Sequence, residues 1–124
     1  MPVVRAKDAP LFRHAGLAVV GLAAPSRGSR ETSVWRVQLP PGAAGVPHSV
    51  DREEIFVVLS GCAAASLDDE HTELRAGDAL IVPSGQVFSL GNSGAEPVDA
   101  IAVAPVGIRA RMPSGDAFAP PWAE

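Results

Sequence analysis

Residues 42–61 read GAAGVPHSVDREEIFVVLSG, and this stretch decides how the rest of the chain is interpreted. Within it Gly42, His48, Glu54 and Gly61 are separated by five, five and six residues. Residues 77–92, GDALIVPSGQVFSLGN, form a second block in which glycine, proline, glycine and asparagine stand at positions 77, 83, 85 and 92. Short apolar runs bounded by such turn residues are typical of β-strands in a closed or two-layered sheet.

The spacing in both blocks resembles the two motifs of the cupin superfamily, G-x5-H-x-H-x3-E-x6-G and G-x5-P-x-G-x2-H-x3-N. The residues named above match in identity and register, and Asp78 fits the usual Gly-Asp turn. The resemblance covers about residues 33–106. It implies an all-β, RmlC-like fold, the double-stranded β-helix or jelly-roll barrel. We expect residues 1–124 to form a single cupin domain.

The metal ligands that the motifs carry are only half present. In cupins two histidines and a glutamate from the first motif and a histidine from the second bind a metal, but Val50 and Phe88 occupy two of these positions. Two protein ligands rarely hold a first-row metal tightly. We therefore expect no cofactor, and at most a weakly bound divalent metal on the remnant ligands His48 and Glu54, with Gln86 as a conceivable third ligand.

The two other histidines of the chain are the remaining candidates for metal ligands. His71 lies in a predicted polar hairpin tip, residues 68–71, and His14 follows Arg13. Both positions are more typical of solvated surface histidines than of metal ligands.

Side chains two apart in a strand face the same way, which allows several of the motif residues to project into the barrel together. A carboxylate beside apolar neighbours must be paired or protonated if it faces inward. We predict His48 and Glu54 as a coupled pair of catalytic or ligand-orienting residues at the polar floor of an apolar pocket. The predicted substrate-binding residues around them are Val50, Phe56, Gln86 and Phe88.

Three functions remain open at this point. The first is a small-molecule-binding cupin with metal-independent proton-transfer, isomerase, cyclase or decarboxylase chemistry. The second is a metal-dependent oxygenase or isomerase with an unusual ligand set, and the third is a non-catalytic binding or regulatory cupin. The sequence does not distinguish an enzyme from a binding protein, because one fold hosts many functions.

Further strands follow from the apolar pattern. Trp35, Val37 and Leu39 alternate with polar residues, which predicts one buried face. Residues 55–59 are apolar on both faces, as expected where the outer face is covered by a second sheet or subunit. Residues 62–67, 79–82, 87–90 and 98–106 read as strands, and residues 17–22 as a strand that adds to the sheet edge.

The composition of the chain limits the kinds of molecule that it is expected to bind. The formal charge of −4 with a single lysine argues against nucleic acid. The lone Cys62 forms no internal disulfide, and no segment approaches the ~20 apolar residues of a membrane span. We expect a cytoplasmic protein with a small-molecule ligand and no membrane partner. The apolar strand face and Trp122, which needs an apolar partner on its own barrel or on a second subunit, suggest a homodimer.

Overall fold

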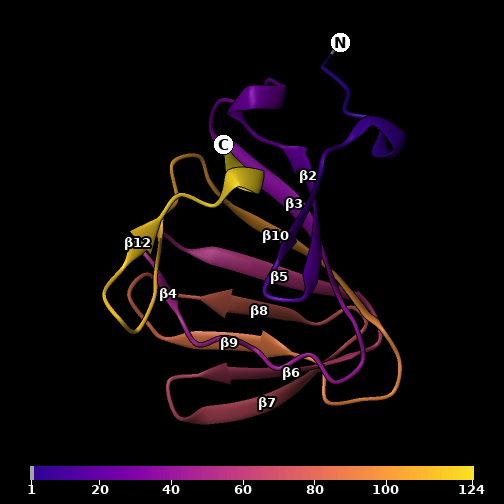
Figure 1. Ribbon diagram of the computed structural model, residues 1–124, viewed down its shortest axis with the longest axis vertical. Helices are drawn as coiled ribbons and strands as arrows, with labels where there is room; N and C mark the ends of the chain where they lie inside the picture. The colour runs from indigo at the N-terminus through magenta and orange to yellow at the C-terminus, as the bar shows by residue number, and fades with distance from the viewer. Residues whose placement is uncertain (1) are drawn as a thin grey trace.

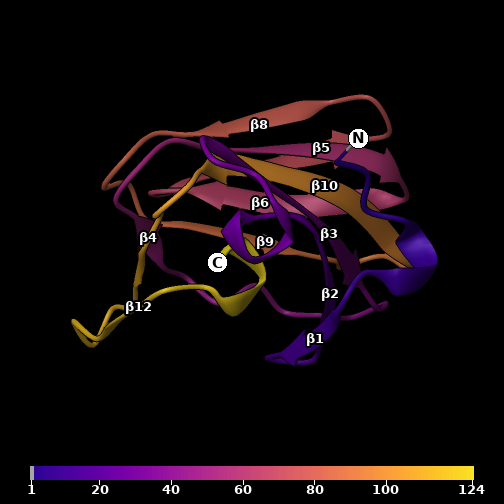
Figure 2. The ribbon, with the colours of Figure 1, turned by 90° about the horizontal axis from the view of Figure 1, so that it is seen from above.

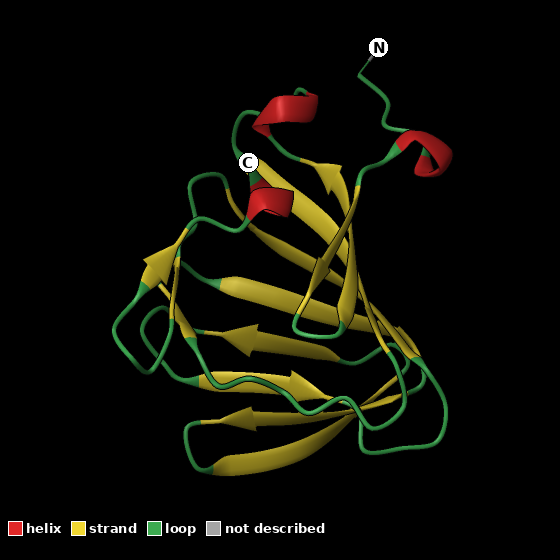
Figure 3. Ribbon diagram, viewed as in Figure 1, coloured by secondary structure: helices red, strands yellow, loops and turns green. Residues whose placement is uncertain are grey.

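The computed structural model describes residues 2–124, which fold mostly into β-strands with three one-turn 3-10 helices (Figures 1 and 3). The helices are η1 (Ala6–Asp8), η2 (Pro25–Arg27) and η3 (Pro121–Ala123). In chain order the strands are β1 (Leu11–His14), β2 (Leu17–Ala23), β3 (Thr32–Leu39), β4 (Ser49–Val50), β5 (Glu54–Ser60), β6 (Cys62–Leu67), β7 (Glu70–Arg75), β8 (Ala79–Val82), β9 (Phe88–Gly91), β10 (Val98–Pro105), β11 (Ala110–Arg111) and β12 (Ala117–Phe118).

These strands form one large and two small antiparallel sheets. The large sheet has the order β1-β2-β3-β10-β5-β8, and the small ones have the orders β7-β6-β9 and β12-β11-β4. A backbone bridge between His48 and Phe88 joins the approach to β4 with β9. Figure 2 shows β4 and β12 at the same end of the molecule as the C-terminal segment. The strands therefore have the predicted all-β architecture.

The barrel interior is filled by the apolar faces of the strands. In β3 the side chains of Trp35, Val37 and Leu39 are buried, while Arg36 points outward and pairs with Asp99 of β10. The alternation predicted for this strand is therefore confirmed. No helix in residues 2–124 is both long and apolar enough to span a bilayer.

The motif glycines and asparagine set the turns between strands. Gly61, between β5 and β6, has a φ of 82°, and a side chain there would collide with the carbonyl oxygen of Pro97. Asn92 is buried, and its amide nitrogen donates to the carbonyl oxygens of Leu39 and Glu96 at 3.1 and 2.7 Å. These two motif positions therefore serve the backbone rather than the pocket, since Gly permits the left-handed turn and Asn satisfies buried carbonyls.

Three details differ from the sequence-based expectations. The segment 17–22 does form a strand, but β1 lies outside it, so β1 and not β2 is the sheet edge. The tip of the β6–β7 hairpin is Asp68-Asp69, and His71 lies one residue into β7 as an exposed side chain. The short strands β11 and β12 had no pattern of their own in the sequence, because two-residue strands are too short to show alternation.

The outer face of the large sheet is apolar across three neighbouring strands. Register pairs Ile55 with Ile81 and with Val103, so these side chains form a contiguous row. Ile81 and Leu59 remain 57% and 49% exposed. Exposed apolar patches of this kind usually mark an interaction surface.

We propose that this face joins two copies of the chain in a homodimer. Light scattering should give about twice the 12.7 kDa chain mass. Ile81→Glu should give the monomer, because a charge would be buried without a partner. Val87→Glu, at an exposed apolar residue in the turn before β9, is the control and should leave the mass unchanged. A monomeric mass for the unsubstituted chain would refute the dimer.

Candidate functional site

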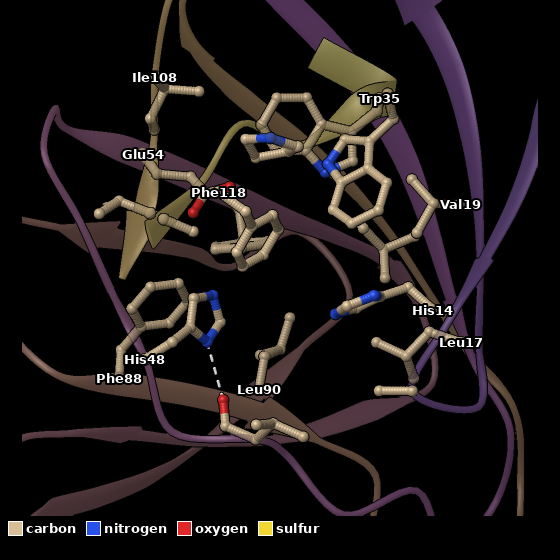
Figure 4. A pocket seen from close by; sticks show the side chains of 18 of the residues that line it. His14, Leu17, Val19, Trp35, His48, Glu54, Phe88, Leu90, Ile108 and Phe118 are labelled. Carbon is tan, nitrogen blue, oxygen red and sulfur yellow. Dashed lines mark hydrogen bonds between the residues drawn. The ribbon is translucent and has the colours of Figure 1, made fainter. Parts of the chain in front are cut away.

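A cavity of about 110 Å³ lies inside the barrel (Figure 4). An engineered apolar cavity of about 150 Å³ in another protein binds benzene, so this space suits about one aromatic ring. Its wall is mainly aliphatic and aromatic, with few polar groups, as in most small-molecule sites. The lining residues that carry the argument below are His14, Trp35, His48, Val50, Glu54, Phe56, Phe88, Phe118 and Trp122.

Among the residues that the structure describes, Glu54 is the one acidic side chain of this wall. It begins β5, is only 5% exposed, and has apolar neighbours in the strand. Within residues 2–124 no hydrogen bond or ion pair is made by its carboxyl group. Burial raises the pKa of Glu54 from 4.5 to about 8. The side chain is therefore mainly a neutral carboxylic acid at pH 7, able to donate a hydrogen bond or a proton.

His48 lies on the same side of the cavity as Glu54 (Figure 4). Its Nδ1 is 2.8 Å from the carbonyl oxygen of Val46. Because a carbonyl oxygen only accepts, Nδ1 carries the proton of the neutral ring, which leaves Nε2 as an acceptor and base. Burial lowers the pKa of His48 below its usual 6.5, the bond to Val46 opposes this shift, and the nearby charge of His14 adds to it.

The predicted pair lines one cavity but is not joined by a hydrogen bond within residues 2–124. The imidazole of His48 instead bonds the backbone carbonyl oxygen of Val46. A molecule in the cavity is therefore needed to link the acid of Glu54 to the base of His48.

Three of the four residues predicted around this pair line the cavity. Val50, Phe56 and Phe88 line the cavity, with ring centroids of Phe88 at 4.4 Å from His48 and 5.7 Å from Phe56. Gln86 is the exception, because it is not among the lining residues. It lies in the turn after Pro83, before β9 begins, so the strand alternation that was used to aim it inward does not apply.

The residues present do not fit a tightly held metal ion. Val50 and Phe88 fill two of the four positions where cupins place ligands, and both side chains are buried. Residues 2–124 contain no group of three or more histidine, cysteine, aspartate or glutamate side chains that could hold a metal. Gln86 lies away from the cavity wall, so it does not complete the set.

Several cavity residues were not identified as such from the sequence. His14 is exposed, as expected, but it also forms part of the cavity wall opposite Glu54 and His48 (Figure 4), and its ring centroid is 5.8 Å from that of Phe118 and 5.5 Å from that of Trp122. Trp122 docks on its own chain, where η3 packs against β2 and β3. The aromatic tail was the only signal for this contact, and Phe118 had none.

The fold of this chain is similar to that of several solved structures. Among solved structures, the polyketide cyclase RemF from Streptomyces resistomycificus superposes with a TM-score of 0.75 at 21% identity, over 85% of this chain and 79% of that one. A cupin-superfamily sugar phosphate isomerase from Silicibacter pomeroyi gives 0.73 at 16%, over 94% and 92%. A predicted oxalate decarboxylase from Thermotoga maritima gives 0.70 at 22%, over 83% and 97%.

These identities are low enough that the likeness concerns the fold alone. No curated protein matches the sequence. The model of the Cupin domain matches residues 35–104, more than half of the chain, and this chain therefore belongs to the cupin family.

Proposed function

We propose that this cupin binds a small, uncharged aromatic molecule in its barrel cavity, held between Glu54 as a neutral acid and His48 as a neutral base, without a bound metal. The observation that carries the proposal is the buried Glu54 carboxyl, which lines an apolar cavity and has no protein partner within residues 2–124. A buried polar group of this kind is costly unless something satisfies it.

The wall supports an aromatic and uncharged ligand. Phe56 and Phe88 offer ring faces and edges to a planar molecule, which favours stacked or edge-to-face contact. Among residues 2–124, no arginine or lysine lines the cavity to balance an anionic ligand. A charged molecule would lose its hydration without compensation.

Proton transfer on the bound molecule is the second step that the site supports. The Glu54 acid would give its proton to a ligand oxygen while Nε2 of His48 takes one from a neighbouring carbon, so the number of protons is conserved. Isomerisation and cyclisation through an enol use such transfers, whereas decarboxylation starts from an anionic carboxylate that this wall does not balance. The names of similar structures include a polyketide cyclase and a sugar phosphate isomerase.

Calorimetric titration with acetophenone, a single ring with one carbonyl acceptor, tests the binding proposal. We expect binding at about pH 6 and about tenfold weaker binding at about pH 9, because ionised Glu54 no longer donates a hydrogen bond. Glu54→Gln keeps the size of the side chain and an N–H donor that does not ionise. The affinity of this variant for acetophenone should therefore be the same at both pH values.

Two outcomes would contradict the proposal. Acetophenone that fails to bind the unsubstituted protein would remove the ligand site. An equal loss of affinity with pH in the unsubstituted protein and in Glu54→Gln would show that Glu54 does not contact the ligand. If binding stands but Glu54→Gln leaves turnover of an identified substrate unchanged, the site binds without using Glu54 as an acid.

A further inference from the structure

The indole nitrogen of Trp122 is a buried hydrogen-bond donor without a partner in residues 2–124. Its side chain is only 9% exposed and forms part of the cavity wall. Buried indole N–H groups usually find an acceptor, and each unsatisfied one in a folded protein needs an explanation.

The contacts that hold the C-terminal segment do not involve this nitrogen. Arg27 donates from Nη2 to the carbonyl oxygen of Trp122 at 2.7 Å, and Ser33 donates from Oγ to that of Ala123 at 2.9 Å. The ring itself packs edge-on against Phe12, with centroids 6.3 Å apart. The backbone of the segment is therefore fixed by η2 and β3, while the enclosed indole nitrogen has no partner in residues 2–124.

The position of the segment explains why an acceptor is missing. Phe118 of β12 and Trp122 of η3 line the cavity together with residues of β3 and β5, so residues 117–123 form a cap over the barrel. The rings beside the indole are those of Phe12 and His14, and no group of residues 2–124 accepts a hydrogen bond from its nitrogen. An acceptor oxygen on a bound molecule would satisfy this N–H.

We propose that Trp122 is a ligand-binding residue whose indole N–H donates a hydrogen bond to an acceptor oxygen of the molecule in the cavity, with residues 117–123 acting as the cap that brings it there. The inference rests on the proposed function and narrows it. Together with the Glu54 acid, the cavity presents two donors, which selects small aromatic ketones and related oxygenated rings over hydrocarbons. Because the nitrogen is enclosed, the cap shifts slightly outward as the ligand binds.

The indole N–H signals in a proton–nitrogen NMR spectrum test this directly. The chain has two tryptophans and so two such signals, which Trp35→Phe assigns. Acetophenone should move the Trp122 signal downfield, as a new hydrogen bond requires. α-Methylstyrene, which carries C=CH2 in place of the C=O of acetophenone, should not. A Trp122 signal that does not move downfield when acetophenone binds would overturn the inference.

A variant measures the contribution of the donor. Trp122 is replaced by 3-benzothienylalanine, which has the shape of tryptophan with sulfur in place of N–H. The preference of the protein for acetophenone over α-methylstyrene should fall about two- to tenfold relative to that of the unsubstituted protein.

The outcomes separate this inference from the proposed function. If neither compound binds the unsubstituted protein, both proposals fail. If both compounds bind and the preference is the same with and without the N–H of residue 122, only the role of Trp122 fails.

Discussion

Raising the pH from about 4.5 to about 8 should remove up to about 5 kcal/mol from the free energy of unfolding through Glu54 alone. The carboxyl ionises near its ordinary pKa of 4.5 in the unfolded chain but keeps its proton up to about pH 8 when folded. The native state therefore binds more protons than the unfolded state throughout this window. Stability falls as the pH rises through it and becomes constant above.

Urea unfolding at a series of pH values measures the effect. The glutamine in Glu54→Gln cannot ionise, so this variant lacks the loss of stability that Glu54 causes. The free energy of unfolding of Glu54→Gln minus that of the unsubstituted protein should therefore increase as the pH rises from about 4.5 to about 8. His48, whose pKa is lowered by burial, contributes the opposite slope below its ordinary 6.5, and it cancels in this difference because both proteins contain it. Glu53→Gln, at the exposed neighbouring carboxylate, is the control. A flat difference for Glu54→Gln would mean that Glu54 is not buried as a neutral acid.

Restoring the two absent ligands should create a metal site. Val50 and Phe88 line the same cavity as His48 and Glu54, and the rings of His48 and Phe88 are 4.4 Å apart. Val50→His with Phe88→His would therefore place four donors around one point, the number that a zinc ion prefers. We expect the double variant to bind about one equivalent of zinc or a similar divalent metal, and the unsubstituted protein to carry well under one equivalent.

Elemental analysis gives the metal content, and thermal unfolding with and without a chelator gives its effect on stability. Val50→Leu with Phe88→Leu controls for disturbed packing, because Phe88 is only 1% exposed. A chelator should lower the melting temperature of the double histidine variant alone. A double histidine variant without metal would contradict the alignment of the motifs, and stoichiometric metal in the unsubstituted protein would contradict the reading of the site as degenerate.

The fold was predictable because its turns need particular residues. Backbone geometry requires Gly61, and buried carbonyl groups require Asn92. These positions therefore match the two motifs, although Val50 and Phe88 stand at two of the ligand positions. The alternation of β3 was also predictable, because one face of that strand is buried and the other carries polar side chains such as Arg36, which pairs with Asp99 of β10. Such local signals act within a few residues, which is the range that a sequence pattern covers.

The site was predictable only where a strand carried it. Glu54 and Phe56 share a face of β5 and both line the cavity, whereas Gln86 lies in a turn, where alternation has no meaning. Trp122 reaches the cavity through the docking of η3 on β2 and β3, and His14 of β1 lies beside its ring. Contacts of that kind depend on tertiary packing and leave no periodic signal in the sequence.

The protonation state of Glu54 tests the account most directly, because the ligand, the acid role and the pH dependence of stability all depend on it. Carbon-13 NMR of protein labelled at the glutamate carboxyl carbons, with Glu54→Gln to assign the signal, follows that one group through a pH titration. A midpoint near 8 is the result that the account predicts. A midpoint near 4.5, the ordinary value for a solvated glutamate, would contradict it.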